Sequence, residues 1–188
     1  MKRGLLIVLS GPSGVGKGTV LRSFINNPDL NLAYSVSLTT RSARAGEVDG
    51  INYHFVSRDY FKQRIDNGDF LEYAEFVGNY YGTLWTAVEE LRNQGKNVLL
   101  EIEVQGALQV TKKCPEALSI FIIPPSFEEL ERRIRQRKSE SDENIKKRLA
   151  KAKKEMSLID NYKYIVCNDD PRLAAEIISV IIKRSMES

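Results

Sequence analysis

The chain has 188 residues, of which 42% are hydrophobic and 28% charged, and its formal net charge is +3. This composition excludes a disordered chain, and no apolar run approaches the roughly 18 residues that a membrane span needs. Two cysteines cannot form a disulfide framework and lack the spacing of a paired-cysteine zinc site, and one histidine excludes a His-based metal site. The basic N-terminus leads into an apolar stretch too short for a signal peptide, so we expect a cytoplasmic protein with no membrane partner.

The positive charge is concentrated in residues 128–155, which hold 11 Lys and Arg against 7 Asp and Glu. Such a run is typical of a solvated helix face, and it is also typical of a site for a polyanion. Both interpretations stay open at this point. The small overall charge argues against a nucleic-acid partner.

Strands and helices alternate along most of the chain. Four apolar runs predict parallel strands covered on both faces, at residues 5–9, 98–102, 118–123 and 164–166. Helices are predicted at residues 17–26, 86–94 and 105–113. A further helix is predicted to begin with a capping box at Ser126 and Glu129 and to end near residue 138. The last helix is predicted to follow the cap and first-turn proline at residues 170–171. The last helix is expected to bury Leu173, Ile177, Ile178 and Ile181. The pattern predicts an α/β fold with right-handed crossovers.

Residues 34–82 interrupt this alternation. They hold 10 of the 16 aromatic residues, together with short alternating runs such as residues 52–56. We expect a small mixed or antiparallel lobe with its own apolar packing, inserted after the first crossover. The polar segment 128–155 is expected to form a second, helical excursion.

A glycine-rich loop joins the first predicted strand to the first predicted helix. It satisfies the pattern G-x-x-x-x-G-K with Gly11, Pro12, Ser13, Gly14, Val15, Gly16 and Lys17. In this context glycines let backbone N–H groups point at phosphate oxygens, and the lysine and the helix N-terminus add positive charge. Gly18 takes the place of the usual Ser or Thr, and Thr19 follows it. The loop predicts binding of a nucleoside triphosphate.

Several further segments are specific enough to indicate a family. They are Ser35–Arg41, Arg44, Gly46–Val48, Gly50, Tyr53, Asn79–Thr83 and Glu101–Gly106. With these motifs the chain resembles the guanylate kinase family over residues 4–184. The resemblance implies a P-loop NTPase-type parallel sheet flanked by helices, in a single domain spanning residues 1–188. The core would comprise residues 1–33, 84–125 and 156–188, the GMP-binding lobe residues 34–83 and the helical lid residues 126–155.

The same resemblance implies an activity. Members transfer the γ-phosphoryl group of ATP to GMP, giving ADP and GDP, a step of purine nucleotide metabolism that recycles GMP. Magnesium (Mg²⁺) would accompany ATP, and the partners would be the small molecules ATP and GMP. Acceptance of dGMP, and whether the chain is a monomer or a homo-oligomer, stay open.

The resemblance also carries site residues, position by position. ATP would be bound by the loop residues 11–17 with Gly18, Thr19 and Asn168; catalysis would rest on Lys17 and on the lid arginines Arg133, Arg137 and Arg148. GMP would be bound by Ser37, Arg41, Arg44, Tyr53, Glu72, Tyr81, Thr83, Glu101 and Glu103. Magnesium would lie near Thr19 and Glu101, held through water. Lys138 stands where a glycine is usual, and Glu101 and Glu103 stand where aspartates are common.

These residue types suit the chemistry. Arg41 and Arg44 offer planar donor forks to a phosphate dianion, and the Glu72 carboxylate can accept from both donors on the Watson–Crick edge of guanine. Glu101 and Glu103, two apart near a strand end, are expected to share one face. The acceptor phosphate carries no proton to remove, so no general base is needed.

The competing hypothesis is a guanylate-kinase-like interaction module without catalytic activity. Loss of the loop lysine or of the phosphate arginines would favour it, but Lys17, Arg41 and Arg44 are all present. A P-loop protein that binds nucleic acid is a third possibility, which the net charge of +3 disfavours.

Overall fold

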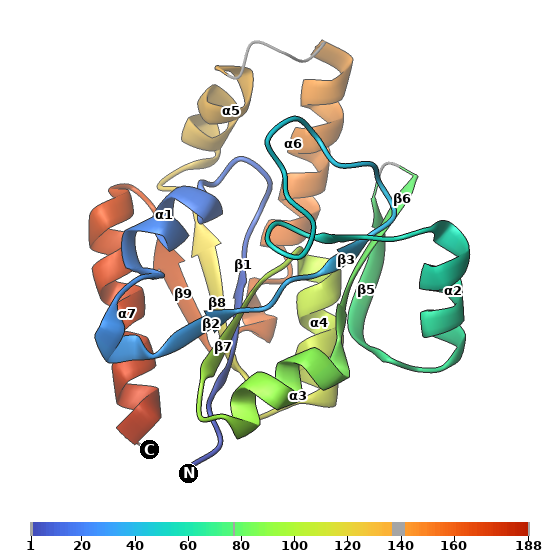
Figure 1. Ribbon diagram of the computed structural model, residues 1–188. Helices are drawn as coiled ribbons and strands as arrows, with labels where there is room; N and C mark the ends of the chain where they lie inside the picture. The colour runs from blue at the N-terminus through green and yellow to red at the C-terminus, as the bar shows by residue number, and fades with distance from the viewer. Residues whose placement is uncertain (1, 77, 137–141, 188) are drawn as a thin grey trace.

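The computed structural model describes residues 2–76, 78–136 and 142–187. Its centre is a parallel five-stranded sheet in the order β2-β7-β1-β8-β9 (Figure 1). The strands are β1 (Leu6–Ser10), β2 (Leu32–Tyr34), β7 (Asn97–Glu101), β8 (Leu118–Ile123) and β9 (Tyr164–Cys167). The predicted parallel sheet is therefore confirmed.

Helices cover both faces of this sheet. The side chains of Ile7 and Leu9 in β1 pack with helices α1 (Lys17–Phe24) and α7 (Pro171–Glu187). The alternate side chains of Leu6 and Val8 pack with α3 (Trp85–Asn93) and α4 (Val104–Lys113). A strand buried on both faces has apolar residues at every position, which explains its near-continuous apolar run.

Strand β2 is the strand of the parallel sheet that the sequence did not predict. It has three residues, it lies at the edge of the sheet, and its side chains are half-buried or exposed. Tyr34, which we assigned to the inserted lobe, pairs with Leu99 of β7 in the parallel sheet. The other predicted strand limits differ from the observed ones by no more than one residue at either end.

The inserted lobe contains a second, mixed sheet in the order β4-β3-β6-β5. Its elements are β3 (Leu38–Thr39), β4 (His54–Phe55), α2 (Arg58–Asp66), β5 (Phe70–Phe76) and β6 (Asn79–Leu84). Phe61 of α2 is fully buried and stacks on Phe70 and Tyr80, with ring centroids 4.4 and 5.4 Å apart. The clustered aromatic residues thus form the small separate core that their density predicted.

The lid consists of α5 (Phe127–Arg135) and α6 (Asp142–Met156). Ser126 caps α5, since its hydroxyl accepts from the N–H of Glu129 at 3.1 Å. The reciprocal half of the predicted capping box is wrong, because the Glu129 carboxylate instead accepts from Arg132 and Arg133. The predicted continuation of this helix to residue 138 reaches outside the described residues.

Helix α7 is capped as predicted, and two of its four predicted core residues, Ile178 and Ile181, pack in the core, whereas the other two do not. Asp170 accepts from the N–H of Arg172 at 2.7 Å. Leu173 is 56% exposed and Ile177 41%, whereas Ala174, Ala175, Ile178 and Ile182 are buried. The small alanines let α7 pack closely on α1, so packing geometry selects that face over the most apolar stripe. Two 3₁₀ turns, Pro28–Leu30 and Ile159–Asn161, complete the chain.

None of the helices in the described ranges has the length and apolar character needed to cross a membrane.

Candidate active site

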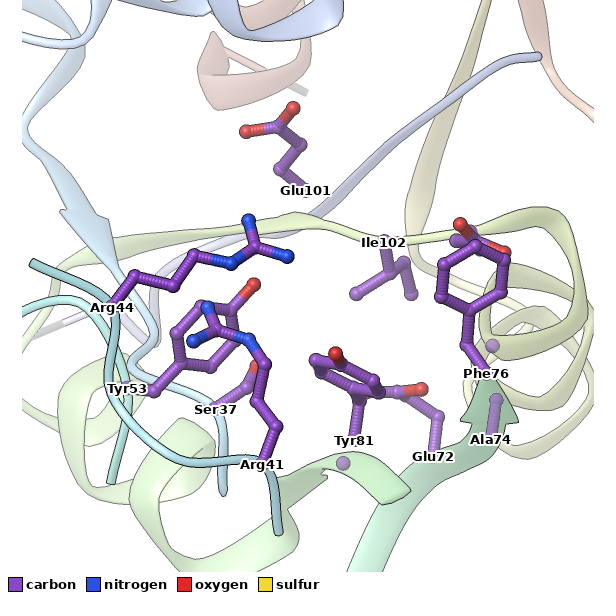
Figure 2. Close-up of a pocket in the computed structure, with 13 residues that line it drawn as sticks. Ser37, Arg41, Arg44, Tyr53, Glu72, Ala74, Phe76, Tyr81, Glu101 and Ile102 are labelled. Atoms are coloured by element: carbon purple, nitrogen blue, oxygen red, sulfur yellow. The ribbon is translucent and has the colours of Figure 1, made fainter. Parts of the chain in front are cut away.

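An open cavity of about 270 Å³ lies between the lobe and the carboxyl end of β7. Figure 2 shows side chains from both sides pointing into it. Eight of the nine predicted GMP-binding residues line it: Ser37, Arg41, Arg44, Tyr53, Glu72, Tyr81, Glu101 and Glu103. The structure therefore brings together residues that lie up to 66 positions apart in the chain.

The ninth residue, Thr83, lies behind the cavity wall and holds Glu72. Thr83 is fully buried, and its hydroxyl donates to Glu72 Oε1 at 2.7 Å. The Thr83 oxygen also lies 3.1 Å from the hydroxyl of Ser37, so the three predicted side chains form one network. Glu72 is 5% exposed, and this burial raises its pKa to about 7 although Thr83 and Lys113 act in the opposite direction.

The two phosphate arginines and Tyr53 lie together on the other side of the cavity, and Tyr81 lies between them and Glu72 (Figure 2). The Arg41 guanidinium lies over the Tyr53 ring, 5.1 Å from its centroid. The Tyr53 and Tyr81 rings meet edge to face with centroids 6.0 Å apart. Aromatic support of this kind holds a guanidinium in place while leaving it attractive to an anion.

Glu47 belongs to this end of the site, although we assigned it no role from the sequence. Its carboxylate accepts from both terminal nitrogens of Arg41, at 2.6 and 2.7 Å, and from the N–H of Arg44 at 2.8 Å. These contacts lower the pKa of Glu47 to about 2. The available signal was its place in the quoted motif, three residues after Arg44 in the same loop.

The glycine-rich loop lies between β1 and α1, as predicted. Gly16 caps α1 with φ at 96°, and a methyl group there would lie 2.7 Å from Asn168 Nδ2. The same amide donates to the carbonyl of Val15 at 2.7 Å. Asn168 is therefore a buried support of the loop, 1% exposed. Lys17 Nζ donates to the carbonyl of Gly11 at 2.7 Å, and burial lowers the pKa of this lysine.

Two of the three predicted lid arginines reach the loop. Arg148 Nη2 donates to the hydroxyl of Ser13 at 2.8 Å. Arg133 Nη1 donates to the carbonyls of Asn168 and Val15 at 3.0 and 3.3 Å, and its Nε pairs with Glu129. Arg137 lies outside the described residues.

The two predicted strand-end carboxylates both line the cavity, but they do not lie on one strand. Strand β7 ends at Glu101, whereas Glu103 lies beyond it and caps α4. Glu101 is half-buried, which raises its pKa, while the nearby Lys17 and Arg22 oppose this rise. Glu103 is exposed and forms a short ion pair with Lys151 of the lid. Lys151 also lies over the Phe76 ring of the lobe, 4.5 Å from its centroid.

Comparison with known proteins agrees with this geometry. The family model described as Guanylate kinase matches residues 3–185. The chain belongs to the guanylate kinase family. It is 55% identical over 182 residues to a guanylate kinase of Lactococcus lactis, covering 97% of this chain and 88% of that protein. A guanylate kinase of Streptococcus pyogenes is 52% identical over 182 residues, covering 97% and 86%.

A solved structure is also similar to this guanylate kinase family member. The crystal structure of guanylate kinase from Anaplasma phagocytophilum has a TM-score of 0.77 and 34% sequence identity. The match covers all of this chain and 89% of that one. The α/β fold with its central parallel sheet is thus shared.

Some cavity residues of this guanylate kinase family member were not predicted. They are Ala74, Phe76, Gly82, Ile102 and Gly106. These side chains are small or apolar and carry no chemical signal in a sequence. Their role is to shape the cavity, which only the fold reveals.

Proposed function

We propose that this chain transfers the γ-phosphoryl group of ATP to GMP, and that the cavity described above is its GMP site. The observation that carries the proposal is the arrangement of the cavity's two ends. A buried carboxylate suited to guanine lies at one end, and a pair of arginines suited to a phosphate dianion lies at the other. Family membership supports the same reaction.

At the guanine end, Glu72 would accept hydrogen bonds from N1–H and from the exocyclic amine. Thr83 occupies one lone pair of Oε1, so the carboxylate already has a fixed orientation. Adenine offers an unprotonated N1 at the same position and would face a negative oxygen. A site with a buried, oriented acceptor rejects such a ligand strongly, because its own polar groups are left unpaired.

At the phosphate end, Arg41 and Arg44 would neutralise the GMP phosphate. Glu47 already occupies one edge of Arg41, and Tyr53 lies beneath it. The guanidinium is therefore oriented before the substrate arrives. Preorganised charge costs no reorganisation at the moment of reaction, so this arrangement favours the transition state.

On the ATP side, backbone N–H groups of residues 11–17 would hold the phosphates. Lys17 would exchange its hydrogen bonds to backbone carbonyls for contacts with the phosphate oxygens. The contacts of Lys17 with Gly11 and Pro12 are made to the loop itself. Arg148 approaches the same loop at Ser13. These cations and backbone amides would stabilise charge on the transferring group during in-line displacement.

The residues present fit magnesium held mainly by the nucleotide and water. No group of three or more His, Cys, Asp or Glu side chains that could hold a metal occurs in the described part of the chain. Mg²⁺ commonly keeps several waters and takes one or two carboxylates. Glu101 is the carboxylate that most strongly opposes the lowered pKa of Lys17, and its Oε1 would lie 3.8 Å from a methyl group on Gly18. When bound, the ion would neutralise phosphate charge. Glu101 and, through water, Thr19 would hold it.

We further propose that residues 34–83 and 126–155 act as two closing segments over the core. Contacts from the lid to the loop and to the lobe, through Arg148 and Lys151, support this division. Closure would exclude water as a competing acceptor. We also propose a cytoplasmic location, which suits an enzyme that acts on ATP and GMP.

A coupled assay with ATP and each of GMP, dGMP, AMP, UMP and dTMP tests the function. We expect ADP formation that depends on GMP, and much slower ADP formation with AMP, UMP or dTMP. Tight GMP binding without ADP formation would instead support the non-catalytic interaction module. Activity that does not discriminate GMP from AMP would refute the assigned role of the cavity.

A further inference from the structure

One face of helix α4 packs against the part of β5 that carries Glu72. The residues on this face are Gly106, Gln109 and Lys113, spaced three and four apart, as neighbours on one side of a helix are. None of them carries a role in the proposed reaction. Each nevertheless contacts a residue between Phe70 and Tyr73.

The Gln109 side chain makes backbone hydrogen bonds that a neighbouring strand would otherwise make. Strand β5 is the outer strand of the lobe's sheet. The Gln109 amide donates to the carbonyl of Tyr73 at 2.7 Å, and its oxygen accepts from the Tyr73 N–H at 3.2 Å. One side-chain amide therefore satisfies both backbone groups of the residue that follows Glu72.

Lys113 holds the backbone on the other side of Glu72. The register between β5 and β6 shifts between Phe70 and Glu72, which leaves Leu71 as a bulge. Lys113 Nζ donates to the carbonyls of Phe70 and Leu71 at 2.9 and 2.8 Å. A bulge redirects the side chains that follow it, so fixing these two carbonyls fixes the direction of Glu72.

Gly106 provides the surface on which the Glu72 carboxylate rests. A methyl group on Gly106 would lie 3.1 Å from Glu72 Cδ and closer still to Oε2. The carboxylate is therefore confined between the Thr83 hydroxyl on β6 and the backbone of α4.

We propose that helix α4 is a specificity element of this enzyme: Gly106, Gln109 and Lys113 are positioning residues that set where the Glu72 carboxylate meets guanine. The proposal rests on the proposed function, in which Glu72 reads the base. It assigns base selection partly to the core, because α4 follows directly after the strand end that carries Glu101.

The first test compares two glutamines on the same helix. Gln109→Met keeps the side-chain length but removes both hydrogen bonds to Tyr73, and Gln105→Met is the matched control at an exposed position. We expect Gln109→Met to raise KM for GMP at least about fivefold, because small misplacements of binding groups are costly, and to leave KM for ATP unchanged. The ratio of kcat/KM for GMP over AMP should fall, while Gln105→Met behaves as wild type. An unchanged ratio would overturn the proposal.

Gly106→Ala provides an independent test should Gln109→Met fail to fold. Alanine favours a helix interior over glycine by about 1 kcal/mol, so the helix itself should not weaken. The added methyl must displace the Glu72 carboxylate, so KM for GMP should rise about tenfold with little change in melting temperature. A variant with normal GMP kinetics would contradict the proposal.

The pH dependence separates a positioning role from a merely structural one. Glu72 must be ionised to accept both guanine donors, and Lys113 is the charged group that faces it from α4. A carboxylate displaced toward water should ionise at lower pH, so the rise of kcat/KM for GMP should move from near pH 7 toward lower pH in Gly106→Ala. Wild type inactive on GMP would refute the proposed function. If wild type is active on GMP, and Glu72→Gln impairs this activity whereas Gln109→Met and Gly106→Ala do not, only the role of α4 is refuted.

Discussion

Replacing Glu72 by glutamine should stabilise the protein while impairing its reaction. Burial raises the pKa of Glu72 from 4.5 to about 7, which means that the folded state favours the protonated form. Ionisation of this side chain therefore opposes folding. Glutamine keeps an acceptor oxygen for Thr83 and carries no charge, so it removes that opposition.

The size of the effect follows from the two pKa values. Each pKa unit corresponds to about 1.4 kcal/mol, so the raised pKa corresponds to about 3 kcal/mol of lost stability. Below pH 4.5 Glu72 is protonated in both the folded and the unfolded state, so it does not oppose folding. As the pH rises from about 4.5 to about 7, the folded state binds more protons than the unfolded state, and the free energy of unfolding falls. Above that range the full cost is present.

Urea unfolding from about pH 4.5 to about pH 8 measures this difference. Glu72→Gln and wild type should have similar free energies of unfolding at the acid end, and the variant should be more stable by about 3 kcal/mol at the alkaline end. Glu75→Gln, on the same strand with a half-exposed side chain, is the matched control and should follow wild type. Parallel pH profiles for Glu72→Gln and wild type would refute the argument from burial. In the same samples, KM for GMP should rise strongly in Glu72→Gln and KM for ATP should change little.

Three further predictions concern the ATP side. Lys17→Ala should lower kcat by orders of magnitude in the coupled assay, while calorimetry shows GMP binding largely intact; retention of more than about a tenth of kcat would contradict charge stabilisation by Lys17. A ligand that joins both substrates should reduce the radius of gyration in small-angle scattering, and an unchanged profile at saturation would exclude large closure. Gly18→Ser should leave turnover nearly unchanged, because a methyl group at this position would lie 3.6 Å from Arg22 and 3.8 Å from Glu101. Glu101→Gln, in contrast, should raise the magnesium concentration needed for half-maximal turnover. Unaltered magnesium dependence in Glu101→Gln would show that the metal lies elsewhere.

The core of the fold could be predicted because its signals are local. Strand β1 is apolar at four of its five positions, and the glycine-rich loop follows it directly. Strand β2 carried no such signal, because three residues at a sheet edge need neither burial nor alternation. The buried face of α7 could be predicted only at Ile178 and Ile181, since closeness to α1 favours alanines over larger apolar residues such as Leu173.

The candidate site shows a similar division. Residues that belong to the family's motifs, such as Arg41 and Glu72, could be named from the sequence, and they line one cavity. The supports of Glu72 on helix α4 could not be named. Gly106 lies 34 positions further along the chain, and a glycine in a helix carries no indication of which strand will pack against it. Contacts of this kind depend on the packing of two elements rather than on either segment alone.

The pairing of basic side chains with carboxylates is the feature that a count of charged residues does not show. The basic excess of residues 128–155 suggested either a solvated face or a polyanion site. In the structure, Arg133 pairs with Glu129 and Lys151 with Glu103, and in the lobe Arg41 pairs with Glu47. Arg133, Lys151 and Arg41 therefore each have a carboxylate partner. A phosphate that binds Arg41 meets a guanidinium whose charge Glu47 already offsets, so the gain in free energy is smaller than the count of cations indicates. Selection then depends on which anion fits the fixed donor geometry, and net charge alone predicts little about it.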